Sequence, residues 1–365
     1  MFSKVFGNLF TQAFFCIDRY GIGPARLTYG YHADNFYINY IKIVGICSVS
    51  LQPPHPLLSV NSLNIAFGSN RVVKDLSFDL YPGQTLAIVG ESGSGKSMTS
   101  LAIMGLVHYL NATIAGGHIL FRRSTDSAPV DLTQLTDRQM RKIRGKDISM
   151  IFQEPMTSLN PVYTVGDQIT EVLLLHGDYT RATARDEALR LLRLVRLADA
   201  ESLLKRYPHQ LSGGMRQRVM IAMALACKPK VLVADEPTTA LDVTIQAQIL
   251  TIIRDLQKEL GMAVIFITHD MGVVAEIADH VVVMREGEKV EEAAVEPLFE
   301  QPQKAYTRAL LAAVPTLGSM KGQTLPCSEP LVIFDGADVV TRGEATVQDT
   351  VRVQEEPIVR IENLV

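Results

Sequence analysis

The stretch GESGSGKS, residues 90–97, decides the fold of this 365-residue chain. It has the pattern G-x-x-x-x-G-K-S and lies between an apolar run, TLAIV (85–89), and a helix-like run, MTSLAIMGLV (98–107). Glycines in such a loop let backbone N–H groups converge on phosphate oxygens, and the start of the following helix adds a favourable dipole. The strand–loop–helix setting therefore predicts a site for the phosphates of a nucleotide.

Two side chains of this loop carry specific chemistry. Lys96 is expected to reach the β- and γ-phosphates, and the Ser97 hydroxyl is expected to ligate Mg²⁺. The alternative is a chance glycine-rich turn, which at average glycine content would occur on the order of one per cent of the time. The predicted ATP-binding loop consists of Gly90, Glu91, Ser92, Gly93, Ser94, Gly95, Lys96, Ser97 and Met98.

A pair of carboxylates follows a second apolar run, VLVADE (231–236). Asp235 ends the run, where a carboxylate can hold Mg²⁺, usually through water. Glu236 follows it and is placed to polarise the water that attacks the γ-phosphate. An acidic pair that caps the next helix is the structural alternative. Together with the phosphate loop, the pair favours nucleotide hydrolysis.

Continuous apolar runs recur along the middle of the chain and predict strands buried on both faces, as in a parallel sheet covered by helices. These runs are residues 85–90, 147–152, 230–236, 263–270 and 280–284. Between residues 164 and 206 the pattern becomes helical. One predicted helix has an apolar face formed by Ala188, Leu191, Leu192 and Val195. Its basic residues, Arg190, Arg193 and Arg196, lie off that face and are interpreted as solvated rather than as contacts to nucleic acid.

Composition excludes several classes of protein. The net charge of −4 provides no electrostatic case for binding nucleic acid. The cysteines contain no C-x-x-C pair, which argues against a disulfide framework or a zinc site; they are Cys16, Cys47, Cys227 and Cys327. No apolar run reaches the roughly 18 residues that span a bilayer. Residues 1–50 contain a weak match to a targeting signal and are assigned no function.

A further motif, LSGGMRQR (211–218), resembles the signature of ATP-binding cassette proteins, and the order of all the motifs agrees with that family. The resemblance covers about residues 57–315. It implies that Phe67 lies against adenine and that Gln153, in the glutamine loop, is linked to Mg²⁺ and the γ-phosphate. Ser212, Gly213 and Gly214 belong to the signature itself. Asp242 lies in the loop that contacts the opposite subunit, and His269 is the switch histidine.

The family implies an α/β fold of the P-loop NTPase type. Its parts are a RecA-like core sheet with helices, an antiparallel β subdomain and an α-helical signature subdomain. A signature that opens a helix is a second phosphate cap. Since the P-loop already occupies one side of the nucleotide, the cap must come from another cassette, in tandem or in a homodimer. The resemblance therefore implies two ATP molecules clamped head to tail, with ATP and Mg²⁺ as cofactors.

Three longer strings resemble the peptide and nickel importer ATPases of bacteria: residues 151–169, 207–225 and 235–250. This group implies an ATPase bound peripherally to two permease subunits at the cytoplasmic face of the inner membrane, with a periplasmic solute-binding protein acting indirectly. Many single-cassette members carry several cysteines, associated with an iron–sulfur cluster, after a tail like YTRALLAAVP (306–315). Only Cys327 follows that tail here, so we expect no iron–sulfur cluster.

The C-terminal PIVRIENLV (357–365) repeats the pattern of PLLSVNSLN (56–64), where the cassette begins. Such a repeat resembles the tandem import ATPases of the glutathione type, in which two cassettes share one chain. The expected domains are an extension of unknown role at 1–55, a nucleotide-binding domain at 56–318 with its helical subdomain at about 153–225, a linker at 319–356, and the start of a truncated second cassette at 357–365.

The expected function is ATP binding and hydrolysis for a bacterial importer of peptides, with glutathione, dipeptides or oligopeptides as the substrate class. Two alternatives stay open from the sequence. One is a truncated half that binds ATP without turnover, because each motif supplies only half of a composite site. The other is a non-transport, soluble cassette ATPase that acts on ribosomes or DNA, against which the acidic composition counts.

Overall fold

The computed structural model describes residues 55–124, 127–153, 158–239, 242–312, 331–335 and 338–342. Most of the predicted N-terminal extension and the predicted second-cassette strand at 357–365 lie outside these residues. Part of the glutamine loop, residues 154–157, also lies outside them.

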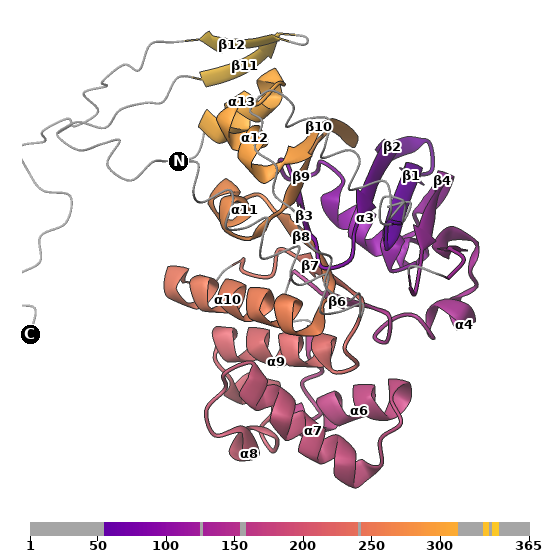
Figure 1. The fold of residues 1–365 in the computed structure, drawn as a ribbon, viewed down its shortest axis with the longest axis vertical. Coiled ribbons are helices and arrows are strands. Elements are labelled where there is room, and N and C mark those ends of the chain that lie inside the picture. Colours follow the sequence, from indigo (N-terminus) through magenta and orange to yellow (C-terminus); the bar gives the residue numbers. More distant parts are fainter. Residues whose placement is uncertain are drawn as a thin grey trace, which may run out of the picture. The chain divides into compact units, whose positions relative to one another are not determined.

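A six-stranded sheet forms the centre of the fold, in the order β10-β9-β3-β8-β7-β6 (Figure 1). Its strands are β3 (Thr85–Val89), β6 (Ile148–Ile151), β7 (Val231–Asp235), β8 (Ala263–Thr268), β9 (His280–Arg285) and β10 (Glu288–Ala294). The first five pair in parallel, and they are the five apolar runs of the sequence, so the predicted parallel sheet is confirmed. β10 adds an antiparallel edge beside β9.

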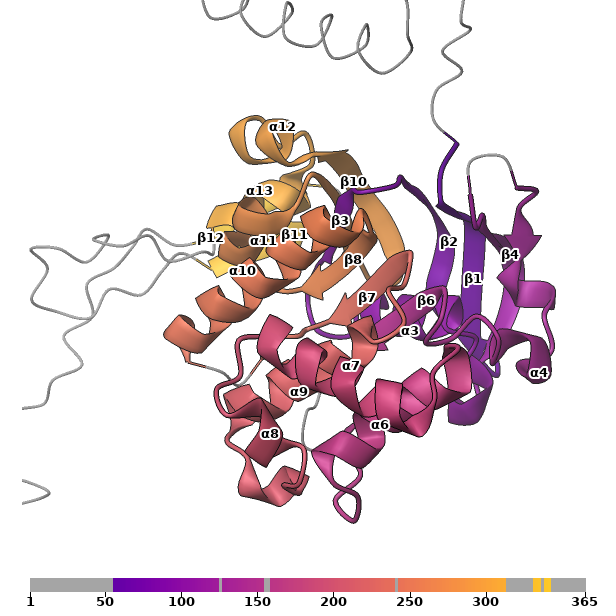
Figure 2. The same cartoon turned by 60° about the horizontal axis from the view of Figure 1, so that its bottom comes forward.

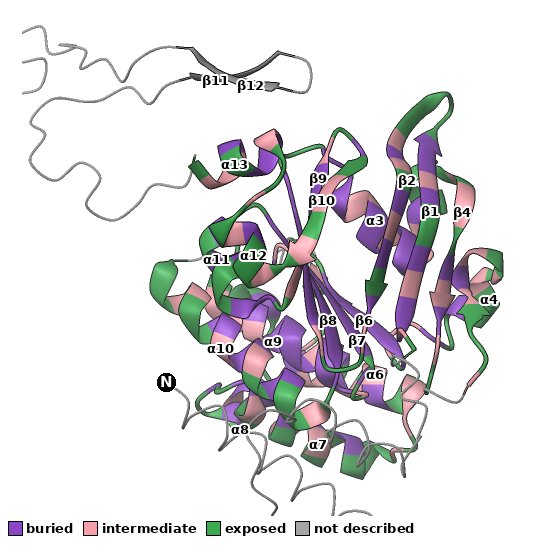
Figure 3. Ribbon diagram, turned by 45° about the horizontal axis from the view of Figure 1, so that its top comes forward, coloured by how far each residue is buried: buried purple, intermediate pink, exposed green. Residues whose placement is uncertain are grey.

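Successive side chains of a strand point to opposite faces of the sheet, so they pack into different cores. Leu232 and Ala234 of β7 pack in the core formed with the helices. Val231 and Val233 pack in the core shared with the antiparallel sheet. Figure 3 shows the central strands as buried along their length. Burial on both faces explains why these strands are continuous apolar runs.

A second, antiparallel sheet has the order β2-β1-β4-β5. Its strands are β1 (Leu58–Phe67), β2 (Asn70–Leu80), β4 (Thr113–Phe121) and β5 (Val130–Asp131). Its buried face shares one core with α3 (Lys96–Ile103), the helix that follows the phosphate loop. This sheet is the antiparallel β subdomain that the family resemblance implies.

The helices that the structure describes between β6 and β7 form the helical subdomain, which Figure 2 brings forward. They are α6 (Val165–His176), α7 (Arg181–Leu194), α8 (Ala200–Leu203) and α9 (Gly213–Leu225). The predicted apolar face on α7 and just after it, Ala188 to Val195, is buried in their core. The three basic residues each form an ion pair with a carboxylate: Arg190 with Glu187, Arg193 with Glu201 and Arg196 with Asp255. Their interpretation as a solvated face therefore holds.

The remaining elements complete the cassette. The helices are α4 (Asp137–Met140), α10 (Val243–Leu260), α11 (Met271–Ile277), α12 (Val295–Glu300) and α13 (Ala305–Ala312), with short 3-10 turns at Val107–Leu110, Leu132–Gln134 and Pro208–Gln210. Within the predicted linker, strands β11 (Leu331–Asp335) and β12 (Asp338–Arg342) pair in an antiparallel hairpin. Among the described residues, no helix has the length and apolar character needed to cross a bilayer.

Candidate functional site

The phosphate loop joins β3 to α3 and depends on glycine at two tightly packed positions. Gly90 has φ 149°, and a Cβ there would lie 2.1 Å from the carbonyl oxygen of Met284 on β9. Gly95 has φ 97°, and its Cβ would lie 2.7 Å from the carbonyl oxygen of Val72 on β2. Only glycine combines these backbone angles with such close approach. The loop is therefore packed directly between the two sheets.

The ammonium group of Lys96 lies within the curve of this loop. It donates hydrogen bonds of 2.8 Å to the carbonyl oxygens of both Gly90 and Glu91. Burial lowers the pKa of Lys96, although the nearby charges of Glu236 and Asp235 act in the opposite direction. The charge of Glu91 acts in the same direction as those two. Three carboxylates therefore stabilise the positively charged form of Lys96.

Ser97 and Asp235 come together as predicted. The Ser97 hydroxyl donates a 3.1 Å hydrogen bond to Oδ1 of Asp235, and the Ser100 hydroxyl donates one of 3.2 Å to Oδ2. Burial raises the pKa of Asp235, against the opposing effect of these two hydrogen bonds. A hydroxyl and a carboxylate are hard oxygen ligands that suit Mg²⁺, which is usually held by one or two carboxylates together with phosphates and water.

The Glu236 carboxylate is the meeting point of three side chains. Its Oε2 accepts hydrogen bonds from Gln153 Nε2 at 3.0 Å and from Thr239 Oγ1 at 2.9 Å. Its Oε1 lies 3.1 Å from Nδ1 of His269. Burial alone would raise the pKa of Glu236, but the hydrogen bonds from His269 and Thr239 outweigh it and lower the pKa. The carboxylate is therefore ionised at neutral pH and able to accept a proton.

The topology of the sheet produces this convergence. Glu236 follows β7 and His269 follows β8, and these strands are neighbours whose carboxyl ends share one edge. The backbone N–H of Glu236 donates a 2.9 Å hydrogen bond to Ile267 of β8, which locks the two ends together. Glu236 also has φ 45°, an unusual backbone conformation for a non-glycine residue, of the kind that concentrates at functional sites.

Phe67 ends β1 at the tight connection to β2 and is 37% exposed. Val72, shortly after that connection, has the carbonyl oxygen that a Cβ at Gly95 would meet. The segment that follows the β1–β2 connection is thus close in space to the phosphate loop, and Phe67 offers a ring face for stacking.

The signature residues form a separate group. Ser212 caps α9, where its hydroxyl accepts a 3.4 Å hydrogen bond from the N–H of Met215. Asp242 caps α10 and accepts a 2.9 Å bond from the N–H of Ile245. A Cβ at Gly214 would lie 2.9 Å from Ile245, so the starts of α9 and α10 are adjacent. Within the described residues, no hydrogen bond joins Ser212, Gly213, Gly214 or Asp242 to the phosphate loop.

Sequence reasoning missed four residues that support the site. Ser100 holds Asp235, Thr239 holds Glu236, and the Tyr306 phenol accepts a hydrogen bond from the N–H of Glu91. Gln217 of α9 donates to the carbonyl oxygen of Pro237, linking the signature helix to the segment after Glu236. Ser100 was open to prediction, because it lies three residues after Ser97 on the same helix face. Tyr306 had no local signal, since only folding brings it near the loop.

Comparison with known proteins agrees with this geometry. The sequence model of the ABC transporter family matches residues 73–239. The chain is 56% identical over 317 residues to a glutathione import ATP-binding protein, GsiA, of Pectobacterium atrosepticum, covering 86% of this chain and 50% of that protein. It is 55% identical over 313 residues to the protein of the same name in Escherichia coli O1:K1, covering 85% of this chain and 50% of that protein. The chain thus spans about half the length of the curated relatives it matches.

Solved structures with the same fold are also ATP-binding cassettes. One is a dimeric cassette in a post-hydrolysis state bound to ADP and Pi, with a TM-score of 0.56, 27% identity, and coverage of 65% of this chain and 98% of that one. Another is cbiO1 from Clostridium perfringens, part of the ABC transporter complex cbiONQ, with a TM-score of 0.57 and 27% identity. That match covers 72% of this chain and 97% of the other.

Proposed function

Because this chain carries the ATPase domain of the ABC transporter family, we propose that it binds Mg²⁺ and ATP and hydrolyses the ATP to drive a bacterial importer. The observation that carries the proposal is the convergence of Gln153, Thr239 and His269 on Glu236, beside the Ser97–Asp235 pair. A carboxylate ionised and oriented in this way can act as the general base on an attacking water.

Each residue has a role in this mechanism. The backbone N–H groups of residues 90–97 and the Lys96 ammonium bind the phosphates, and Phe67 stacks on adenine. Ser97 and Asp235 would hold Mg²⁺, with Gln153 as a further ligand, and the ion would supply positive charge to offset that of the phosphates. Glu236 takes the proton from the water. His269 fixes the orientation of Glu236 and senses the γ-phosphate.

A second cassette completes the site. Ser212, Gly213 and Gly214 open α9, whose free N–H groups form an anion-binding end, but these residues do not bond to the phosphate loop of their own chain. We therefore propose that they cap the ATP held by a partner cassette, in tandem or in a homodimer, with Asp242 at the contact. A solved cassette of the same fold is dimeric with ADP and Pi bound, which supports this arrangement.

The names of the relatives support the transport role. Two of them are glutathione import ATP-binding proteins, so we propose a short peptide, with glutathione first, as the imported substrate. The cassette would then bind peripherally to two permease subunits at the cytoplasmic face of the inner membrane, and a periplasmic binding protein would deliver the substrate. Uptake of labelled glutathione and of a labelled dipeptide, with and without this chain, would distinguish the two substrates.

The hydrolytic role is tested by Glu236→Gln, which keeps the size of the side chain and removes the base. We expect ATP binding to be retained and turnover to fall at least about a hundredfold, the usual contribution of general base catalysis. Glu259→Gln on the exposed side of α10 is the matched control and should leave both quantities unchanged. Normal turnover in Glu236→Gln would rule out the assigned base.

The separation of the signature from the phosphate loop also favours a second candidate, an ATP-binding half that cannot turn over by itself. Turnover of the purified chain, measured against protein concentration, discriminates the two. An active homodimer gives activity that rises faster than linearly with concentration. A half that needs a different partner cassette binds ATP yet stays inactive at every concentration.

A further inference from the structure

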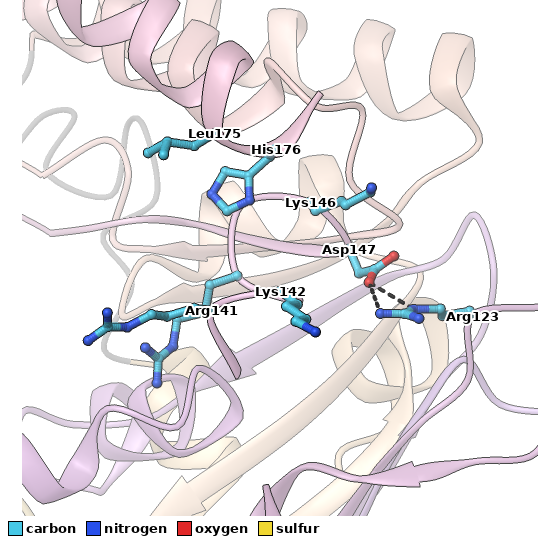
Figure 4. Close-up of a pocket in the computed structure, with 8 residues that line it drawn as sticks. Arg123, Arg141, Lys142, Lys146, Asp147, Leu175 and His176 are labelled. Atoms are coloured by element: carbon cyan, nitrogen blue, oxygen red, sulfur yellow. Dashed lines mark hydrogen bonds and ion pairs between the residues drawn. The ribbon is translucent and has the colours of Figure 1, made fainter. Parts of the chain in front are cut away.

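A basic cavity lies away from the residues assigned to the nucleotide (Figure 4). It has a volume of about 830 Å³. Its walls come from the end of β4, the segment between α4 and β6, and the end of α6. The lining residues are Arg123, Arg141, Lys142, Arg144, Lys146, Asp147, Leu175 and His176. None of them belongs to the proposed ATP site, so the cavity needs its own explanation.

Positive charge in this cavity exceeds its local compensation. Arg123 pairs with Asp147 at 2.8 Å, and Asp137 pairs with both Arg141 at 2.9 Å and Arg144 at 2.8 Å. The lining has five cationic side chains, and the two carboxylates paired with its arginines leave an excess of three positive charges.

Two lysines account for most of that excess. Among the ion pairs of the described residues, none involves Lys142 or Lys146, and both residues are exposed. The excess stands out because the whole chain carries a net charge of −4. Concentrated charge of one sign inside a concave surface focuses the field on a ligand of opposite charge.

The wall is held in place before any ligand arrives. Arg144 is only 17% exposed and donates hydrogen bonds of 2.7 Å to the carbonyl oxygen of Met104 and 3.0 Å to that of Gly105. The Asp147 carboxylate, which orients Arg123, is 10% exposed. Guanidinium groups fixed in this way lose little conformational freedom when they bind an anion.

His176 closes one side of the cavity by packing over the loop that holds the lysines. Gly145 has φ 76°, and a Cβ there would lie 3.1 Å from Nε2 of His176, so the ring rests on the glycine backbone. Burial and the charge of Lys146 lower the pKa of His176. The ring is therefore neutral at neutral pH and can donate one N–H to an anion without adding charge.

We propose that this cavity binds a phosphate group, contacted by Lys142 and Lys146 and oriented by the fixed guanidinium of Arg144. Ammonium groups beside a fixed guanidinium supply the positive charge and the N–H donors that phosphate oxygens accept. An acidic peptide helix would need a row of apolar anchors, and the lining supplies only Leu175. The phosphate could belong to a soluble compound or to the headgroup of an anionic lipid.

The test uses the full chain with Lys96→Ala, which removes the charged side chain of the proposed ATP site, and binding is assigned to the cavity by substitutions of the cavity lysines, so the result does not depend on the proposed function. Inorganic phosphate is titrated by calorimetry, and vesicles of phosphatidic acid are compared with vesicles of phosphatidylcholine by co-sedimentation. Binding of inorganic phosphate identifies a soluble source. Binding of phosphatidic acid vesicles alone identifies a lipid headgroup.

The decisive variant is Lys142→Glu with Lys146→Glu, for which we expect binding at least about tenfold weaker. The matched control, Lys258→Glu with Lys304→Glu, makes the same charge change at exposed positions elsewhere and should bind like the parent. If the reversed variant fails to fold, the double alanine variant replaces it. The proposal is overturned if neither inorganic phosphate nor phosphatidic acid vesicles bind, or if the lysine variants and the parent bind equally.

Discussion

The phenolic oxygen of Tyr306 accepts a 3.3 Å hydrogen bond from the backbone N–H of Glu91, which joins α13 to the phosphate loop. The Arg285 guanidinium lies 5.3 Å from the centre of the same ring, within the range of a cation–π contact. Burial raises the pKa of Tyr306, so the phenol stays protonated at neutral pH. Helix α13 is therefore tied to the predicted phosphate-binding loop.

Replacing Tyr306 by phenylalanine removes the acceptor and keeps the ring. We expect ATP affinity to fall about fivefold, because a hydrogen bond of this kind contributes about 1 kcal/mol. Equilibrium titration with a fluorescent ATP analogue measures the change. Tyr109→Phe, at a largely exposed tyrosine, serves as control. Equal affinities in all three proteins would show that α13 does not support the loop.

Two glycine substitutions separate backbone strain from steric conflict. Gly261→Ala places a Cβ in open space at φ 62°, so it should cost about 1 kcal/mol of unfolding free energy. Gly90→Ala adds a collision with the Met284 carbonyl oxygen and should cost about 3 kcal/mol or more, with loss of ATP binding. Urea denaturation compares the two variants. A Gly90→Ala protein as stable as Gly261→Ala would contradict the close packing of the loop.

Thr239→Val tests the electrostatics around the proposed base. The Thr239 hydroxyl bond is one of the contacts that lower the pKa of Glu236, so its removal should raise that pKa. A base with a higher pKa becomes protonated at higher pH, and the acidic limb of the kcat/KM profile should move upward in pH. Thr251→Val, on α10, provides the control. An unmoved acidic limb would mean that Glu236 is not the group titrating there.

Glu187 and Arg190 give a pH-dependent contribution to stability. The paired bonds of 2.8 and 2.7 Å from Arg190 lower the pKa of Glu187 more than burial raises it. The ion pair therefore makes its full contribution to the unfolding free energy above the pKa of Glu187 in the unfolded chain, about 4.3. The contribution is lost as the pH falls through the lower pKa of Glu187 in the folded protein. Because the pair is partly exposed, it should be worth at most about 1 kcal/mol.

Glu187→Gln should thus lower the unfolding free energy at pH 7 and reduce its decline in acid. Chemical denaturation at pH 7 and at pH 3 measures both effects, with Asp186→Asn as the exposed neighbouring control. A variant whose stability falls as steeply in acid as that of the parent would show that the ion pair has no such role.

The sequence by itself determined the central sheet and the local motifs of the predicted nucleotide site. The glycines of residues 90–97 and the acidic end of the run at 231–236 are local patterns, and the buried parallel strands are continuous apolar runs because both of their faces are covered. Local spacing is enough to identify the loop, because phosphate binding needs a fixed loop geometry. It is also enough to identify the strands, because burial of both faces of a strand leaves no position for a polar side chain.

Only the tertiary structure decided which side chains meet. The contact of Tyr306 with Glu91 and the basic cavity arise where segments distant in sequence come together. The bond of Thr239 to Glu236 arises where a strained backbone turns the chain. From the sequence alone, lysines and arginines are interpreted as parts of a solvated surface. The arginines of α7 lie on such a surface, whereas Lys142 and Lys146 line a cavity, because only packing determines whether neighbouring charges lie on an open surface or on a concave one.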